Sequence, residues 1–529
     1  MARSRTTALF WGAGALAWVL GMVAARPLVG GDPTLVVAQT VIEAAPGSIA
    51  TWAIETFGKY AQWLLVVGVS LGIVGAGGAI GIALDRGGFN IRRRVQAAYA
   101  IALGVFAITA SGFYVAGDGI SSRWLLATVL AVVPPGAVWW AQVGPRGPVG
   151  RRRAMRRMSG AAGTVLAGGV LARVLGESRS VGGVQPDTEL DPVDEKTETG
   201  TTTPAPTGTP GKETLESRSE TDGIVVTRAN SDDAFGFDFE GMPDRVGTAQ
   251  DHYVVDKNIS APTVNTQQWE LTIDGAVMDR RTLSYDELRE HPAARELTLT
   301  MVCISNTVGG DLISTTDWTG IPIKTLLEET GVQTDAIDIV THAADGYSEA
   351  LPWSVVSDRE DIFLAFGMDG KTLPRSHGFP ARLLIPGRYG MKSTKWVTDI
   401  EVSTADHEAY WEQRGWDERA VINTLSYIRA IQRRGEQIAV GGVAYAGIRG
   451  IERVEVSLDD GKTWADATLE AAPSPYAWHR WRYEFTQPNA EALNVRVRAT
   501  DSEGNRQRGV RSNPHPGGST GRHSVTLSL

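Results

Sequence analysis

The sequence predicts three structural parts: an N-terminal α-helical membrane domain, a mixed α+β domain, and a C-terminal all-β sandwich. Long uncharged apolar segments within residues 1–176 indicate the first part. Short β-runs mixed with helical stretches over residues 245–425 indicate the second. Alternating apolar and polar residues between Asp-Gly and Glu-Gly turns, from about Ala439 onward, predict an immunoglobulin-like sandwich over residues 426–529.

The membrane domain is expected to contain four to five transmembrane helices. A fifth candidate, Met158–Ala172, has only 15 uncharged residues. Arginine clusters alternate with acidic loops across successive segments, which places the N terminus in the cytoplasm by the positive-inside rule. Five crossings would then place the rest of the chain outside the cell membrane. The four longer segments are Ala8–Ala25, Tyr60–Leu84, Val95–Ala116 and Trp124–Val143.

The charge of the chain is unevenly divided. Residues 1–176 hold 16 Arg and Lys against 5 Asp and Glu, whereas residues 177–529 hold 35 against 55. The basic half is apolar and the acidic half is not, which argues against a nucleic-acid-binding protein. All eight histidines lie outside residues 1–176, so the membrane domain cannot provide a bis-histidine haem site.

A stretch of low apolar content separates the membrane domain from the soluble part. Thr, Pro, Gly and Glu dominate from Glu177 to about Asp222, a composition that cannot bury enough apolar surface to fold. Residues 177–244 are therefore expected to be a flexible linker. Beyond them, Trp269–Ile273 and Ala381–Ile385 are expected as strands and Ile323–Thr330 as a helix.

The only cysteine of the chain, Cys303, follows the β-rich run Leu297–Val302. The loop after it, Ile304–Asp311, contains two glycines that let the backbone approach a ligand closely. A thiol at such a strand end can ligate a soft metal, although a single free cysteine is more often a small buried apolar residue. With one cysteine there is no intrachain disulfide.

A second motif lies 74 positions after Cys303. The run Leu373–Val402 contains H-G-F-P-x-R and then a loop that ends in a lysine, and together with Cys303 it resembles the signature of the sulfite oxidase family of molybdopterin enzymes. The resemblance covers roughly residues 245–529. Gly442–Gly447 and Asp460–Trp464 are similar to motifs of that family's C-terminal dimerisation domain.

The resemblance implies molybdenum and molybdopterin as cofactors and oxygen-atom transfer on a small-molecule substrate. It implies that Cys303 ligates molybdenum as a thiolate, and that Trp416 lies where the family has an active-site tyrosine. Taken singly, the matched residues also fit turns or surface ion pairs; in this order and spacing they favour a cofactor site. The expected cofactor-binding residues are Tyr253, Val254, Asp345, His377, Arg382, Ser393, Thr394 and Lys395.

Two departures from the family pattern concern the substrate. Val255 stands where true sulfite oxidases have an arginine for the anionic substrate, and Trp416 replaces the tyrosine. Lys257 or Arg414 could substitute for that arginine. The substrate is therefore left unassigned: another oxo donor or acceptor, such as a sulfoxide or N-oxide, or an unidentified small molecule is expected, with sulfite oxidase proper and a non-catalytic membrane-tethered binding module as alternatives. Expected partners are the membrane, a separate electron carrier or quinone, and a second copy bound through residues 426–529.

Overall fold

The computed structural model describes residues 184–190, 215–221, 224–229, 235–258 and 260–529, and single positions at 53, 64, 65, 67 and 68. The expected membrane segments, Met158–Ala172 included, lie outside the described residues except for four of those positions. Within the described ranges, no helix is both long and apolar enough to cross a membrane. The chain divides into two compact units, 1–181 with 256–263 and 182–255 with 264–529, and the second contains all the strands below.

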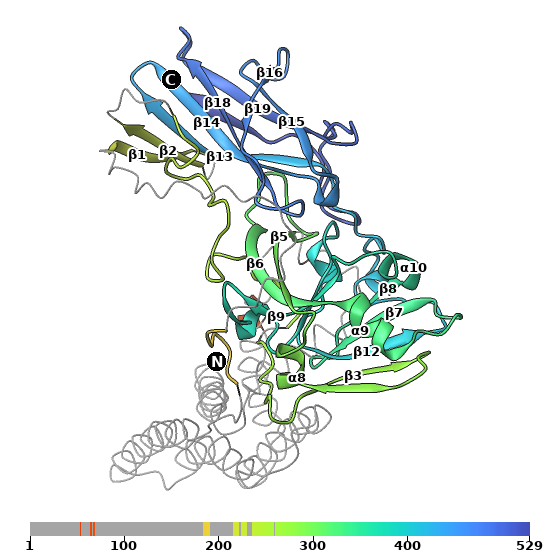
Figure 1. Ribbon diagram of the computed structural model, residues 1–529. Helices are drawn as coiled ribbons and strands as arrows, with labels where there is room; N and C mark the ends of the chain where they lie inside the picture. The colour runs from red at the N-terminus through yellow and green to blue at the C-terminus, as the bar shows by residue number, and fades with distance from the viewer. Residues whose placement is uncertain are drawn as a thin grey trace, which may run out of the picture. The chain divides into compact units, whose positions relative to one another are not determined.

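The first soluble domain is α+β, as the sequence predicts, and contains two five-stranded sheets (Figure 1). One sheet has the order β10-β9-β6-β5, with β11 paired to β9, and the other has the order β4-β3-β12-β7-β8. The strands are β3 (Glu270–Gly275), β4 (Arg281–Ser284), β5 (Arg295–Val302), β6 (Ile313–Pro322), β7 (Asp338–Ala343), β8 (Ser348–Pro352), β9 (Phe363–Met368), β10 (Lys371–Thr372), β11 (Arg382–Leu384) and β12 (Val397–Ser403).

Short helices cover the ends of these sheets. The expected helix is α9 (Ile323–Thr330), which buries Leu326 and Leu327 and ends at Gly331 with φ of 68°. A capping box between Ser284 and Glu287 starts α8. The others are 3₁₀ turns or single helical turns. The bounds are α8 (Tyr285–Arg289), α10 (Trp353–Val356), η2 (Arg375–His377), η3 (Gly390–Lys392) and η4 (Glu412–Arg414).

The second soluble domain is all-β, again as predicted, and consists of two packed sheets. The six-stranded sheet has the order β1-β2-β13-β14-β18-β17 and the four-stranded sheet β16-β15-β19-β20. Their facing apolar side chains, including Val440, Trp481 and Val495, form one core. The elements are β13 (Leu425–Arg434), β14 (Gln437–Tyr445), η5 (Gly447–Arg449), β15 (Ile451–Ser457), β16 (Ala465–Asp466), β17 (Thr468–Leu469), β18 (His479–Thr486), β19 (Ala492–Asp501) and β20 (Ser524–Ser528).

The described parts of residues 177–244 correct the expectation of a flexible linker. Strands β1 (Leu215–Thr221) and β2 (Ile224–Ala229) form a hairpin, and β2 adds in parallel to β13 (Figure 1). Residues 184–190 lie along β10, where the Leu190 N–H donates to the carbonyl of Gly370 at 3.0 Å. Composition alone predicted no structure here, because the partners of these backbone groups lie far away in sequence.

Candidate active site

Cys303 directly follows β5 in a closely held loop. Its N–H donates to the carbonyl of Leu312 at 3.0 Å, and its own carbonyl accepts the N–H of Asn306 at 3.0 Å. The side chain is 8% exposed, and Sγ lies 3.0 Å from Oγ of Ser305. Burial raises the pKa of the thiol, while the hydrogen bonds of Ser305 and the charge of Lys395 act in the opposite direction. A bound metal ion would favour the thiolate further.

The sandwich domain holds the loop that carries Cys303. From β13, Arg429 donates to the carbonyls of Gly309 and Gly310 at 2.9 and 2.6 Å. The hydroxyl of Ser519 donates to the carbonyl of Asn306 at 2.7 Å. A Cβ on Gly309, whose φ is 83°, would lie 2.4 Å from the His523 ring. The second domain thus helps to set the position of the thiol.

The expected basic group of His377, Arg382 and Lys395 is brought together around Gly378. Arg382 donates from Nη1 to the carbonyl of His377 at 3.2 Å, and Lys395 donates from Nζ to the carbonyls of Ser376 and Val255 at 2.8 and 3.2 Å. Gly378 has φ of 113°, and a Cβ there would lie 3.1 Å from the Lys395 Cβ and 3.2 Å from the Arg382 Cβ. A glycine is therefore required between the two cations.

Two neutral histidines, His252 and His377, lie with this basic group, and these residues together are called the cofactor pocket below. Burial, then the charges of Arg382 and Lys395, lowers the pKa of His377 to about 3. Burial likewise holds the pKa of His252 well below its usual value. His377 Nε2–H donates to the carbonyl of Ala249 and His252 Nδ1–H to that of Tyr253, each at 3.1 Å. The remaining nitrogen of each ring is therefore an acceptor.

Three buried polar atoms in this pocket have no hydrogen-bond partner among the described residues: His252 Nε2, His377 Nδ1 and Trp318 Nε1. The His252 ring lies 5.3 Å from that of His377 and 5.5 Å from that of Trp318, and the Arg382 guanidinium lies 5.4 Å from the Trp318 ring. Buried polar groups in native proteins are almost always paired. A pterin, with ring N–H, amino and carbonyl groups and a phosphate, fits these acceptors, this donor and the two cations.

The sequence did not single out His252 or Trp318. His252 directly precedes Tyr253, an expected site residue, and this adjacency was the only available signal. Trp318 reaches the pocket from the middle of β6. The proximity of both to His377 depends on tertiary packing over 59 positions or more, which motif spacing does not report.

Ser393 and Thr394 are buried in the loop that follows η3. The Thr394 Oγ1 lies 2.8 Å from Oγ1 of Thr341 on β7, and its carbonyl accepts the N–H of Leu383 at 2.8 Å. The Ser393 N–H donates to the carbonyl of Gly390 at 3.1 Å. Hydrogen bonds to Thr341, Leu383 and Gly390 therefore hold the residues that lead to Lys395.

Trp416 lies in an apolar cluster shared by both domains, with Val302 and Ile304 on either side of Cys303. Its indole Nε1 is buried and has no hydrogen-bond partner in the described part of the chain. Tyr389 belongs to the same cluster. Burial raises the pKa of Tyr389, the hydrogen bond from Asn423 opposes this, and a charge on Cys303 adds to it. The cluster that contains the two sequence neighbours of Cys303 therefore combines aromatic and aliphatic side chains.

The other expected residues differ in how closely they join the site. The pKa of Tyr253 is raised well above its usual value by burial and then by Cys303, and a Cβ on Gly390 would lie 2.8 Å from its hydroxyl. The Val254 side chain is 46% exposed. Asp345 lies in the β7–β8 turn, where its carboxylate accepts the N–H of Tyr347 at 3.0 Å, as an Asp-Gly turn residue does.

Known proteins resemble the chain in these two domains. Residues 258–411 match the oxidoreductase molybdopterin binding domain, and residues 416–511 match the Mo-co oxidoreductase dimerisation domain. The first match contains Cys303, Asp345, His377, Arg382 and Lys395.

Curated relatives include sulfite oxidases and a nitrate reductase. Sulfite oxidase of Gallus gallus is 28% identical over 333 residues, 53% of this chain and 72% of that protein. Mitochondrial sulfite oxidase of Drosophila melanogaster is 27% identical over 316 residues, 49% of this chain and 55% of that one. An NADH nitrate reductase of Solanum lycopersicum is 27% identical over 323 residues, which are 48% of this chain and 35% of that protein. The chain thus spans about half the length of the Drosophila relative.

These matches favour an enzyme over the alternative of a non-catalytic tethered binding module. They coincide with the two soluble domains, and the pocket around His377 and Arg382 has the buried polar groups that a pterin needs. Residues 258–411 are therefore a molybdopterin-binding oxidoreductase domain, with molybdopterin as its cofactor, and residues 416–511 are a Mo-co oxidoreductase dimerisation domain. Over these domains the chain is similar to sulfite oxidases and to a nitrate reductase.

Proposed function

We propose that this enzyme transfers an oxygen atom to or from a small molecule at a molybdenum ion ligated by Cys303. The observation that carries the proposal is that Lys395, which donates to the carbonyl of Ser376 in the His377 segment at 2.8 Å, also lies near the buried thiol of Cys303. Tyr253 lies near the same thiol. The cofactor, when bound, supplies the two-electron chemistry. Arg382 and Lys395 bind its anionic end, the two histidines accept hydrogen bonds from it, and Cys303 holds the metal.

Metal and pterin analysis of the purified full-length protein tests this proposal. One molybdenum and one molybdopterin per chain are expected. A protein that is folded and free of both after expression in a host that makes the cofactor would overturn it.

We propose further that the substrate is a neutral oxo compound, such as a sulfoxide or N-oxide. Three observations support this choice. Val255, at the position where a cation would bind an oxyanion, is 43% exposed and apolar. Arg414 donates to the carbonyl of Tyr410 at 2.7 Å and stacks on its ring, so it is already engaged. The buried side chains packed with Trp416 are aromatic or aliphatic, the His515 ring lies 5.1 Å from the indole ring, and the buried indole N–H can donate to one neutral oxygen.

Sulfite is the competing substrate, because two relatives are named sulfite oxidases. Reduced enzyme should be assayed with sulfoxides and N-oxides, and oxidised enzyme with sulfite, using an artificial electron carrier in both directions. Turnover of a neutral oxide at least tenfold above that of sulfite is expected in kcat/KM. Faster turnover of sulfite would overturn the substrate assignment.

We also propose that residues 1–176 anchor the enzyme as a multi-pass protein of the cell membrane, with residues 177–529 on the outer side. The support is the four long uncharged segments, the alternation of arginine clusters between them, and Met158–Ala172 as a fifth crossing. Because those residues include no histidine or cysteine, electrons would pass to a separate carrier or a quinone.

Protease added to intact cells or spheroplasts tests this orientation. Cleavage within residues 191–214 before lysis is expected. If the soluble half is cut only after lysis, the fifth crossing is wrong and the catalytic domain faces the cytoplasm.

We propose, finally, that the immunoglobulin-like sandwich of residues 426–529 forms a homodimer. The match of residues 416–511 to a dimerisation domain supports this. Light scattering on the detergent-solubilised full chain, corrected for bound detergent, should give the mass of two chains. The mass of one chain at micromolar concentration would contradict it.

A further inference from the structure

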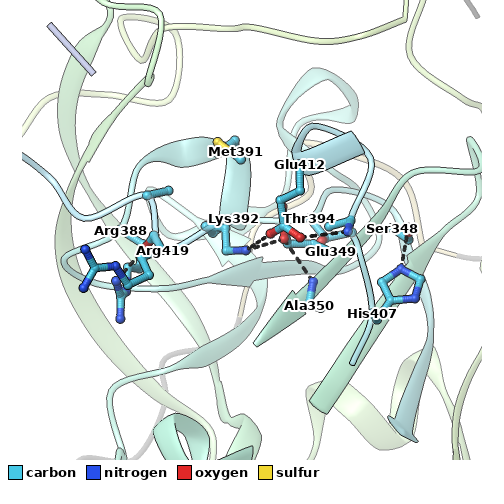
Figure 2. Close-up of polar contacts among 12 residues, drawn as sticks. Ser348, Glu349, Ala350, Arg388, Met391, Lys392, Thr394, His407, Glu412 and Arg419 are labelled. Atoms are coloured by element: carbon cyan, nitrogen blue, oxygen red, sulfur yellow. Dashed lines mark hydrogen bonds and ion pairs between the residues drawn. The ribbon is translucent and has the colours of Figure 1, made fainter. Parts of the chain in front are cut away.

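Lys392, Glu349 and Glu412 form a buried ion triad (Figure 2). Lys392 donates from Nζ to Oε1 of Glu349 and to Oε1 of Glu412, each at 2.6 Å. The exposed fractions of the lysine and the two carboxylate side chains are 2%, 0% and 8%. Such charges are retained in a protein interior only when each has close partners.

The three residues come from three separate elements. Lys392 ends η3, Glu349 is on β8, and Glu412 begins η4. Glu349 also accepts from the hydroxyl of Tyr347 and the N–H of Ala350, both at 3.0 Å. Glu349 is therefore held in place by its own neighbours, and Lys392 joins it to Glu412.

Glu412 is fixed as firmly as Glu349. Its Oε2 accepts the N–H of Ala409 at 2.8 Å. Its carbonyl accepts the N–H of Gly415 at 2.8 Å, and the next residue, Trp416, donates its N–H to the carbonyl of Trp411 at 3.2 Å. Glu412 thus sits inside the compact turn that orients Trp416.

The position of the triad links two parts of the site. Lys392 directly precedes Ser393, Thr394 and Lys395, and the last of these lies near Cys303 and contacts the His377 segment. At the other end, Glu412 is four residues before Trp416, which belongs to the apolar cluster that contains Val302 and Ile304, the sequence neighbours of Cys303. The triad therefore connects the loop 393–395 to the turn that carries Trp416.

We propose that Lys392 is a positioning residue that fixes the cofactor loop 393–395 and the turn bearing Trp416 relative to each other through Glu349 and Glu412. The proposal rests on the proposed function of this site. Removing Lys392 leaves two buried carboxyl groups without the donor that joins them, and whether they repel or one takes up a proton, the link between the two segments is lost.

The experiment uses the full-length protein and four variants. Lys392→Met breaks both arms of the triad at nearly constant volume, and Lys392→Arg keeps the charge. Glu412→Met breaks only the arm toward Trp416, at a less buried position. Lys324→Met is the matched control, because Lys324 also lies between two glutamates, Glu328 and Glu360, at 3.8 and 2.9 Å, but on the surface.

Three quantities are measured for each variant: molybdenum per chain, kcat and KM separately, and the Mo(V) electron paramagnetic resonance spectrum of partly reduced protein. Lys392→Met is expected to lose more than half of its molybdenum and to show altered Mo(V) g-values in the metal that remains. Lys392→Arg should restore both at least partly. Glu412→Met should keep its molybdenum but raise KM about tenfold, since only Trp416 is released. Lys324→Met should match the wild type.

Two results would overturn the inference. The first is a Lys392→Met protein with wild-type metal content, spectrum, kcat and KM. The second, which stands even if Lys392→Met fails to fold, is a folded Glu412→Met protein whose KM and spectrum equal those of the wild type. Failure of the proposed function is a separate result, because the wild type itself would then contain no molybdenum.

Discussion

Cys303 is the residue on which the chemistry of the chain depends. Cys303→Ser keeps the size and the approximate hydrogen bond to Ser305 but replaces a soft sulfur by a hard oxygen. The variant is expected to lose at least nine-tenths of its oxygen-transfer activity and to change the Mo(V) spectrum. Metal content measured beside activity checks this. Stoichiometric molybdenum together with full activity would show that another group is the ligand.

Trp416 offers a narrower test of substrate binding. Trp416→Phe removes the unpaired indole N–H and keeps an aromatic ring in the cluster. One neutral hydrogen bond contributes about 1 kcal/mol, or roughly fivefold in binding. We expect KM for a neutral oxide to rise by about that factor with molybdenum content unchanged. Trp411→Phe, in the neighbouring ring, is the control and should leave KM unaltered.

Glu349 makes the stability of the protein depend on pH. Burial raises its pKa to about 7 in the folded chain, above the ordinary value of 4.5, although the charge of Lys392 opposes the shift. Between these two values the folded chain keeps a proton that the unfolded chain has lost, so stability falls as pH rises. Glu349→Gln removes this titration. Denaturant unfolding of both proteins at pH 5 and pH 7.5 should show a smaller decrease for the variant, and equal decreases would contradict the shift.

Single residues also show the limits of motif reading. Cys303, His377, Arg382 and Lys395 could be named from the sequence because the family motif keeps their types and order. Glu349, Glu412 and His252 could not, since a carboxylate or imidazole carries no local sign that it will be buried beside a cation. Their partners are 43, 20 and more than 100 positions away.

Among the elements, β14 contains Gly442 at a position where the structure has no room for a larger residue. A Cβ on Gly442 would lie 1.9 Å from the carbonyl oxygen of Tyr427, next to a bulge in β13. Backbone cannot yield as a flexible side chain can, so Gly442→Ala should destabilise the sandwich by about 3 kcal/mol or prevent its folding.

Thermal unfolding of the full chain checks this prediction. Gly435→Asn is the matched control in the adjacent β13–β14 turn, where φ is 58° and no atom lies within 4 Å of the added Cβ. Asparagine tolerates that conformation, so only a small change is expected there. If the two variants unfold at the same temperature, close packing at Gly442 is not the reason for the glycine.

Elements with strong local signals were predictable, and those with distant partners were not. Helix α9 carries its own apolar face and a terminal glycine, and β19 alternates buried and partly exposed residues along its length. Strand β2 gains stability from pairing with β13, about 200 positions away, and β1 joins the sheet only through β2. Nothing within residues 215–229 alone distinguishes such strands from a linker.

At the scale of the whole molecule, the catalytic domain depends on the sandwich. Arg429 holds the Cys303 loop by two carbonyls, and its removal leaves those acceptors without their donor. Arg429→Met in the full chain should therefore lower the molybdenum content although the residue does not line the pterin pocket. Arg453→Met, on the exposed face of β15, is the control. An Arg429→Met protein with full metal content would show that the loop holds its shape alone.

The order of the domains could be predicted from composition and pattern, but not how they share a core. The cluster around Trp416 combines Val302 and Ile304 with Tyr427 and Tyr445 of the sandwich. From the sequence, each of these four residues can be recognised only as an apolar position of its own strand or loop. Which surfaces of two domains meet is decided by shape and packing, and a single chain's pattern does not encode it locally.

The segment 184–190 changes what a cut in the chain between the two halves does. Leu190, Thr188 and Gln185 are bound to β10 by backbone and hydroxyl hydrogen bonds, and Leu190 packs on the core of the catalytic domain. A protease that nicks residues 191–214 therefore severs the covalent connection but leaves the two fragments joined by this short strand-like contact. The nicked protein should migrate as one species on a native gel and as two on a denaturing gel. Thr372→Val, which removes the hydroxyl between Thr188 and Gln185, should weaken that association and favour release.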